Sequence, residues 1–311
     1  MPIPLSRSGP LPGFPFGVVA AMFGGIRHLV SSLRGGGAEA PAPRARAPAD
    51  CATCDPELLK TCTGAEPGSV KPFKYHVLVH LPPGVCDDPT PGACVEPLGL
   101  LARAIKATKV KGINLLAYEG VRKLPSPGAG KAHVLFFPPC EDMGTVALDQ
   151  LNDAVVAAVE RREAGPPYSP APLPAAERSR LYLLVCAHGA RDSRCGVLGG
   201  QLSEVLDALL DSKGLSDEVT VLRVSHVGGH VQAGNVIAWG AGWPVDGDWF
   251  GGVHADNAKE WLDAVLAATT RAVDDDALRT YWRGRYDLSK DEQLEAFKAK
   301  AADIEDLAGA A

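Results

Sequence analysis

The chain of 311 residues carries 31 basic and 37 acidic side chains, which gives a net charge of −6 at pH 7. A net acidic protein is poorly suited to binding phosphate backbones, so nucleic-acid binding is disfavoured. With 46% apolar and 22% charged residues the composition is globular, and the length suits about two domains. Eight cysteines are too few for a small disulfide scaffold, but they are enough for a metal site or thiol redox chemistry.

Residues 1–70 lack the pattern of a folded domain, and we expect a disordered leader there. The longest apolar stretch, 14–26, is interrupted by glycine and proline and is shorter than the roughly 20 residues of a membrane helix. We therefore expect no membrane span. Residues 1–49 hold five arginines against one acid, a composition shared by organelle transit peptides and disordered tails, so the predicted location is cytoplasmic or mitochondrial.

The leader also contains the pair Cys51 and Cys54 in a CxxC spacing, followed by Cys62. Such a pair can be redox-active next to a strand and helix pattern. No such pattern surrounds it here, so thiol oxidoreductase activity and the absence of any role both stay open.

Residues 71–163 alternate apolar strand-like segments with helical stripes, which predicts an N-terminal α/β domain. His76 and His80 share one face of its first strand, but they lie about 13 Å apart along the strand and cannot chelate one ion. The expected strands are 74–81, 112–118 and 132–137, and the expected helices are 97–107 and 145–162.

Residues 164–179 form a proline-rich linker, with five prolines between 165 and 174. The same alternation then restarts over 180–289, which predicts a second α/β domain with a mixed sheet and leaves a degenerate duplication open. Its expected strands are 180–185, 218–224 and 235–239, its helices are 201–210 and 256–270, and 290–311 is expected to hold an exposed C-terminal helix.

Two polar segments follow strands of this second domain. Cys186 and Cys195 lie at the two ends of a loop after the first strand, and His226 and His230 follow the next strand. Ligand sites in open α/β sheets collect at such strand ends, so the four side chains meet if the two strands are neighbours. The glycines between the histidines argue against a helix and let both rings turn inward.

Three kinds of site use such residues. A structural Cys2His2 zinc site and an iron–sulfur cluster with two thiolates and two imidazoles both stay open, although the CxxC spacing of zinc ribbons is absent. A phosphatase loop is excluded, since one residue too few separates Cys186 from Arg191. Four unrelated core and surface residues are the remaining alternative.

The motifs HGARDSRCG (188–196) and HVGGHVQAGN (226–235) resemble those of the sucrase/ferredoxin-like family. The WFG of 249–251 and the WRGR of 282–285 resemble further segments of that family. The resemblance is specific over about 181–285, weaker over 74–162, and absent before residue 51.

The resemblance implies a thioredoxin-like ferredoxin domain that holds a [2Fe–2S] cluster on Cys186, Cys195, His226 and His230. It implies electron transfer or redox sensing with redox partner proteins still to be identified, and an electron carrier rather than an enzyme with its own substrate. The N-terminal α/β domain could be a degenerate copy of the same fold. A zinc-stabilised binding module on the same four ligands stays an alternative.

Two neutral imidazoles in place of thiolates make the cluster less negative, so its reduction potential is expected to be raised. Bound imidazole also carries a second ring N–H, which predicts a midpoint potential that falls as pH rises. Around the ligands, Arg191 and Arg194 either raise the potential further or belong to a solvated loop or an ion pair with Asp192. We expect His188 to hydrogen-bond the backbone or tune the site rather than ligate, and Asn235 to cap or shape the second loop.

Overall fold

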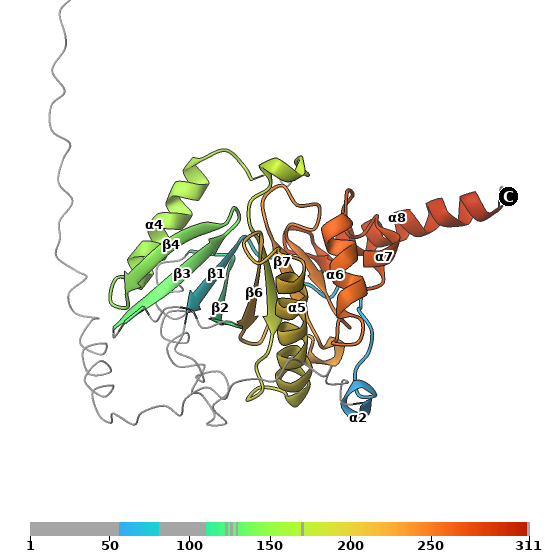
Figure 1. The fold of residues 1–311 in the computed structure, drawn as a ribbon. Helices are drawn as coiled ribbons and strands as arrows, with labels where there is room; N and C mark the ends of the chain where they lie inside the picture. Colours follow the sequence, from blue (N-terminus) through green and yellow to red (C-terminus); the bar gives the residue numbers. More distant parts are fainter. Residues whose placement is uncertain are drawn as a thin grey trace, which may run out of the picture. The chain divides into compact units, whose positions relative to one another are not determined.

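The computed structural model describes residues 56–80, 110–121, 124, 127–128, 130–168 and 171–309, with side chains described up to residue 299. All of them belong to one compact unit, 46–311. A single nine-stranded mixed sheet runs through this unit in the order β4-β3-β1-β2-β6-β5-β7-β8-β9 (Figure 1). The strands are β1 (Tyr75–His80), β2 (Ile113–Gly120), β3 (Lys131–Phe137), β4 (Glu141–Ala147), β5 (Leu181–Cys186), β6 (Val219–Val224), β7 (Val236–Trp239), β8 (Asp248–Phe250) and β9 (Trp282–Arg285).

The sheet consists of the same arrangement twice. In the N-terminal repeat, β1 pairs parallel with β2 and antiparallel with β3, which pairs antiparallel with β4. In the C-terminal repeat, β5 pairs parallel with β6 and antiparallel with β7, which pairs antiparallel with β8. The antiparallel pair of β2 and β6 joins the repeats, so a pseudo-twofold axis passes between these strands. The duplication that the sequence left open is therefore present in the strand order.

Helices of both repeats pack on one face of the sheet (Figure 1). In the C-terminal repeat, α5 (Gly200–Ser212) and α6 (Ala258–Ala267) bury apolar stripes against β5, β6 and β7. In the N-terminal repeat, α4 (Leu151–Ala164) packs on β1 and β3 through Val155 and Val159. In the described part of the chain, no helix is both long enough and apolar enough to cross a bilayer.

The opposite face holds a core shared by both repeats. Leu78 and Leu116 of the first repeat and Leu184 and Leu222 of the second are buried in one cluster. Phe73 packs across it, with its ring 6.0 Å from that of Trp249. The repeats are thus joined by a continuous sheet and a common core, while the boundaries 71–163, 164–179 and 180–289 stay a prediction.

The predicted helix over 145–162 is wrong at its start. Residues 145–147 belong to the edge strand β4, and the helix begins at Leu151. Val146 and Leu148 also fit a helical stripe, but the β-branched Thr145 and Val146 pair with β3 instead. The short β8 and β9, with too few residues for a periodic signal, were not expected at all.

Residues 56–70 are ordered against the domain, although the sequence predicted a disordered leader there. The short helix α2 (Pro56–Leu59) and Cys62 pack on Leu198 and Ala233, and the Thr63 backbone N–H donates to the Val231 carbonyl. The C-terminal helix α8 (Lys290–Gly309) is not fully exposed either, because the Gln293 side chain is completely buried. The predicted helix 97–107, the leader 1–55, Cys86 and Cys94 lie outside the described residues.

Candidate metal centre

β5 and β6 are parallel neighbours, which is the condition under which the sequence brings the two loops together, so their carboxyl ends lie side by side. Cys186 is the last residue of β5 and lies beside Val224, the last residue of β6. His226 follows two residues later, on the loop that leaves β6. Because the two strands are parallel neighbours, the thiol of Cys186 and the imidazole of His226 lie close together without a long connecting loop.

Three donor atoms gather there. The Cys186 and Cys195 sulfurs lie 4.0 and 3.8 Å from Nδ1 of His226. All three donor atoms lie within 4.8 Å of one another, the one such group of three in the part of the chain that the structure describes. Both thiols are completely buried. Cys195 reaches this position because it opens a π-helical turn, η3 (Cys195–Gly199), which leads directly into α5.

The fourth predicted ligand, His230, lies beside the third. The rings of His226 and His230 are 5.8 Å apart at 30°, and Nε2 of His230 lies 3.9 Å from Oδ2 of Asp192. The side chain of His230 is 42% exposed, whereas both thiols are buried. The group therefore has a buried sulfur side and a solvent-facing imidazole side.

A buried arginine contacts the loop 225–235 between β6 and β7, which carries His226 and His230 and is called the histidine loop below. Arg283 of β9 is 2% exposed and donates to Oδ1 of Asn235 at 2.6 Å and to the Gly228 carbonyl at 3.4 Å. Asn235 in turn donates to the Gly229 carbonyl. Gly229 has a φ of +68°, and its position against the guanidinium leaves no room for a Cβ. This loop therefore depends on glycine both for its backbone conformation and for its contact with Arg283.

Burial and hydrogen bonding shift the pKa values at this site. The hydrogen bond from Cys195 and the contact with His226 hold the pKa of the Cys186 thiol well below its usual range, so this sulfur ionises first. Burial lowers the pKa of Arg283 to about 10, while the neighbouring thiols oppose that shift. Negative charge on the sulfurs and positive charge on Arg283 thus stabilise each other.

The other predicted site residues divide into two groups. His188 accepts a hydrogen bond from the His226 backbone N–H, and Asn235 holds the histidine loop, so both contact the ligand segments directly. Arg194 instead forms a bidentate ion pair with Asp192 and lowers the pKa of that carboxyl to about 2. Arg191 is exposed on the loop between Cys186 and Cys195, called the cysteine loop below. Their effects on a cofactor stay predictions.

Two parts of the molecule that contact this site were not predicted from the sequence. Arg283 lies within the WRGR segment noted above, but nothing in a lone sequence indicates that β9 passes beneath the histidine loop. The segment 56–63 was also missed, although Arg194 donates to the Thr61 carbonyl and Cys62 packs next to the site. Burial raises the pKa of the Cys62 thiol.

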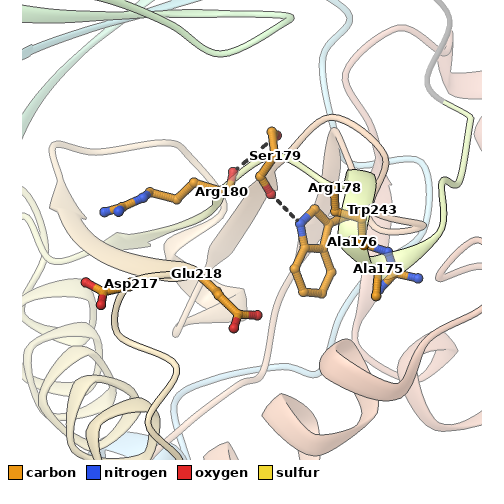
Figure 2. Close-up of a pocket in the computed structure, with 8 residues that line it drawn as sticks. All are labelled: Ala175, Ala176, Arg178, Ser179, Arg180, Asp217, Glu218 and Trp243. Carbon is orange, nitrogen blue, oxygen red and sulfur yellow. Dashed lines mark hydrogen bonds between the residues drawn. The ribbon is translucent and has the colours of Figure 1, made fainter.

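A separate cavity of about 480 Å³ lies at the amino ends of β5 and β6 (Figure 2). Arg178 stacks on Trp243 there, and Trp243 donates to the Ser179 carbonyl. Asp217 and Glu218 face the same space. Its lining includes no thiol or imidazole, so it does not belong to the metal centre at the other end of these strands.

Comparison with known proteins places this chain in a family. The model of the sucrase/ferredoxin-like family matches residues 67–284. The chain belongs to this family. The matched range covers both repeats, and the thioredoxin-like α/β architecture is the one that the sequence predicted. No solved structure matches the chain significantly.

Curated relatives match over a shorter stretch. Altered inheritance of mitochondria protein 32 of Meyerozyma guilliermondii is 36% identical over 86 residues, or 27% of this chain and 29% of the relative. The protein of that name from Eremothecium gossypii is 40% identical over 94 residues, or 28% and 29%. Actin patches distal protein 1 of Saccharomyces cerevisiae is 37% identical over 70 residues, or 20% and 22%. The chain therefore matches less than a third of the length of these relatives.

Proposed function

We propose that this protein is a redox protein that holds a [2Fe–2S] cluster on Cys186, Cys195, His226 and His230. The donor set supports the proposal, because two buried thiols and a ring nitrogen lie within 4.8 Å of one another beside a second imidazole. Thiolates and imidazoles are the ligands of mixed-ligand iron–sulfur centres. The residues present therefore fit the cofactor that the family's ferredoxin likeness implies.

A bound cluster of this kind supplies one-electron chemistry. The chain would set its potential through charge and burial. Two neutral imidazoles limit the negative charge of the ligand set to two thiolates, and the buried Arg283 adds a positive charge beneath the loop. Both features favour an added electron, so the midpoint potential is expected to lie above that of a four-cysteine ferredoxin.

The exposed side of the site suits exchange of electrons with another protein. His230 is 42% exposed, and Val197 and Val231, which follow the ligand residues closely in the chain, are 41% and 38% exposed. Two exposed valines beside a partly exposed ligand give a docking partner an apolar contact at the point of transfer. Electron transfer or redox sensing is therefore the role we propose.

Spectroscopy of anaerobically purified protein tests the cofactor. We expect visible absorption from the wild type and an EPR signal after reduction, and His230→Ala should change or abolish both. His254→Ala is the matched control, because His254 belongs to the same repeat, pairs with Asp256, and should leave both spectra unchanged. Colourless protein without iron would contradict the proposal.

Imidazole ligation also predicts proton-coupled electron transfer. The ring nitrogen that does not bind iron binds a proton more tightly after reduction, so the midpoint potential should fall as pH rises. Redox titration between pH 6 and 9 measures this slope. A flat midpoint over that range would contradict histidine ligation.

A zinc-stabilised binding module is the second candidate. Three donor atoms within 4.8 Å of one another would also suit a single tetrahedral ion. Zinc has no redox chemistry and no colour, so metal analysis separates the two candidates. A thiol oxidoreductase acting through Cys51 and Cys54 stays a prediction outside the described residues.

We further propose a cytoplasmic or mitochondrial location. Its support is the name of the relatives, altered inheritance of mitochondria protein 32, together with the arginine-rich, acid-poor composition of residues 1–49. Fractionation of cells that express the tagged full chain tests this, and a secreted protein would contradict it.

A further inference from the structure

A cavity of about 240 Å³ lies in the N-terminal repeat, on the sheet face opposite the helices. It is lined near the carboxyl ends of β1 and β2 by His80 and Tyr118, and the second repeat contributes Tyr182 and Arg180. Its volume is below the roughly 300–1,000 Å³ of pockets for drug-sized ligands, so it suits a smaller molecule.

The pseudo-twofold axis relates this cavity to the metal centre. β1 and β2 pair in the same register as β5 and β6, which makes His80 the counterpart of Cys186. β3 and β7 correspond likewise, which makes His133 the counterpart of Asn235. The N-terminal repeat therefore carries different chemistry at the place where the C-terminal repeat carries its thiols.

That chemistry is a hydrogen-bonded chain of three side chains. Nε2 of His133 lies 2.9 Å from Oδ1 of Asp142, and Nδ1 lies 2.6 Å from the hydroxyl of Tyr118. In the tautomer whose Nε2–H donates to the Asp142 carboxylate, Nδ1 accepts the hydrogen bond that Tyr118 donates. Burial raises the pKa of Tyr118, which keeps the phenol protonated. Tyr118 lines the cavity, and with its proton donated to His133 its oxygen keeps an acceptor lone pair.

The opposite polar group is a cation. Arg180 lines the cavity and donates to Oγ1 of Thr220 at 3.2 Å. Figure 2 shows its side chain extending away from Trp243, where Arg178 occupies the ring face. Between the cation and the phenol, the wall consists of Tyr182 and leucines of β3 and β6.

We propose that this cavity binds a small aromatic carboxylate that carries a hydroxyl group. The carboxylate pairs with Arg180, the ring packs beside Tyr182 and the leucines, and the hydroxyl donates to the oxygen of Tyr118. Each polar group of the ligand thereby meets the complementary group on the wall. The Asp142–His133–Tyr118 chain fixes the direction of the last hydrogen bond.

Calorimetric titration of the full chain with 4-hydroxybenzoate, benzoate and phenol tests the proposal. We expect 4-hydroxybenzoate to bind about three- to tenfold more tightly than benzoate, the range of one neutral hydrogen bond. Phenol lacks the carboxylate and should bind more weakly than either. Because these three ligands are compared on the wild type, the result does not depend on the folding of a variant.

Variants then locate the site. Tyr118→Phe should remove the preference for 4-hydroxybenzoate over benzoate, and Arg180→Gln should weaken both about tenfold or more. Arg178→Gln is the matched control. Arg178 and Arg180 both line the cavity in Figure 2, but only Arg180 also lines the cavity beside Tyr118, so Arg178→Gln should change neither affinity.

Three results would overturn the proposal. These are no binding of 4-hydroxybenzoate to the wild type, equal affinity for 4-hydroxybenzoate and benzoate, and weakening by Arg178→Gln in place of Arg180→Gln. The titrations measure ligand binding and not metal content, so their outcome is distinguishable from that of the proposed cluster.

Discussion

The two repeats share one strand arrangement and differ at their strand ends. In the C-terminal repeat, Cys186 ends β5 and meets Cys195 and His226 in a group of metal-type donors. In the N-terminal repeat, His80 ends β1 in the corresponding place, and the neighbouring Tyr118 is hydrogen-bonded to His133. The same backbone geometry therefore positions side chains for two kinds of chemistry, and the residue types decide which one is present.

The outer strands of the two repeats differ in their exposure to solvent. β4 is the free edge of the sheet, and its Glu141 is half exposed and paired with Arg161. β8, its counterpart, is covered by β9, so Asp248 is buried and accepts a hydrogen bond from Nε1 of Trp282. One added strand turns an ordinary surface acid into a buried one, and the same strand brings Arg283 beneath the histidine loop.

Removing a thiol should have the largest effect. Cys186→Ser should abolish the visible absorption and the bound iron, because the serine hydroxyl is a poor replacement for a buried thiolate ligand. Cys140→Ser, which removes the half-buried thiol of the N-terminal repeat, should retain both. The comparison of the repeats fails if the two variants lose iron equally, as measured by metal analysis and absorption.

Gly229→Ala should destabilise the protein by about 2–4 kcal/mol. Alanine at a φ of +68° costs roughly 1–2 kcal/mol, and its Cβ would also collide with the Arg283 guanidinium. Gly214→Ala is the matched control, since Gly214 has a φ of +69° and open space around its Cβ position. Denaturant unfolding measures both, and equal losses would show that the contact with Arg283 is not needed.

The buried acid of β8 should make stability depend on pH. Burial raises the pKa of Asp248 to about 7, whereas in the unfolded chain the carboxyl ionises near its ordinary value of 3.8. The folded state therefore prefers the protonated form, and this contribution to stability is lost as pH rises from about 4 to 7. Asp248→Asn should reduce that loss by up to roughly 4 kcal/mol.

Thermal unfolding of the wild type and Asp248→Asn at several pH values between 4 and 8 measures this difference. Glu141→Gln tests the exposed counterpart on β4 and should leave the pH profile unchanged. Parallel profiles for the wild type and Asp248→Asn would show that Asp248 is not the group responsible.

Loss of the buried positive charge of Arg283 should have the smallest effect, a shift in the midpoint potential of the bound centre. Arg283→Gln should lower the midpoint potential of the bound centre by tens of millivolts, where about 59 mV corresponds to a tenfold change in a one-electron equilibrium. Arg283→Lys keeps the charge and should restore most of the shift. If glutamine and lysine shift the midpoint equally, Arg283 acts through the shape of the loop and not through its charge.

Much of this arrangement could be predicted from the sequence. The apolar strand 180–185 and the stripe of 201–210 are long and regular, and they fix where the cysteine loop begins and ends. The sequence predicted that the loops after these two strands meet if the strands are neighbours, and the parallel pairing of β5 and β6 fulfils that condition. The donor residues could thus be named before their geometry was known.

The rest depends on contacts between distant segments. β4 is too polar to show the alternation of a half-buried strand, because it lies at an edge. β8 and β9 have three and four residues, and pairing rather than periodicity makes them strands. The buried position of Arg283 and the Tyr118–His133–Asp142 chain follow from strand order, which local sequence patterns do not encode.

We propose that two thiols and two imidazoles of the C-terminal repeat hold a redox cluster. Pulsed EPR of the reduced protein, with and without ¹⁵N-labelled histidine, tests it most directly. We expect iron and sulfide in equal amounts, and nitrogen couplings that change with the label and are altered in His230→Ala. A reduced protein that binds zinc without iron, or a cluster signal without histidine nitrogen coupling, would contradict it.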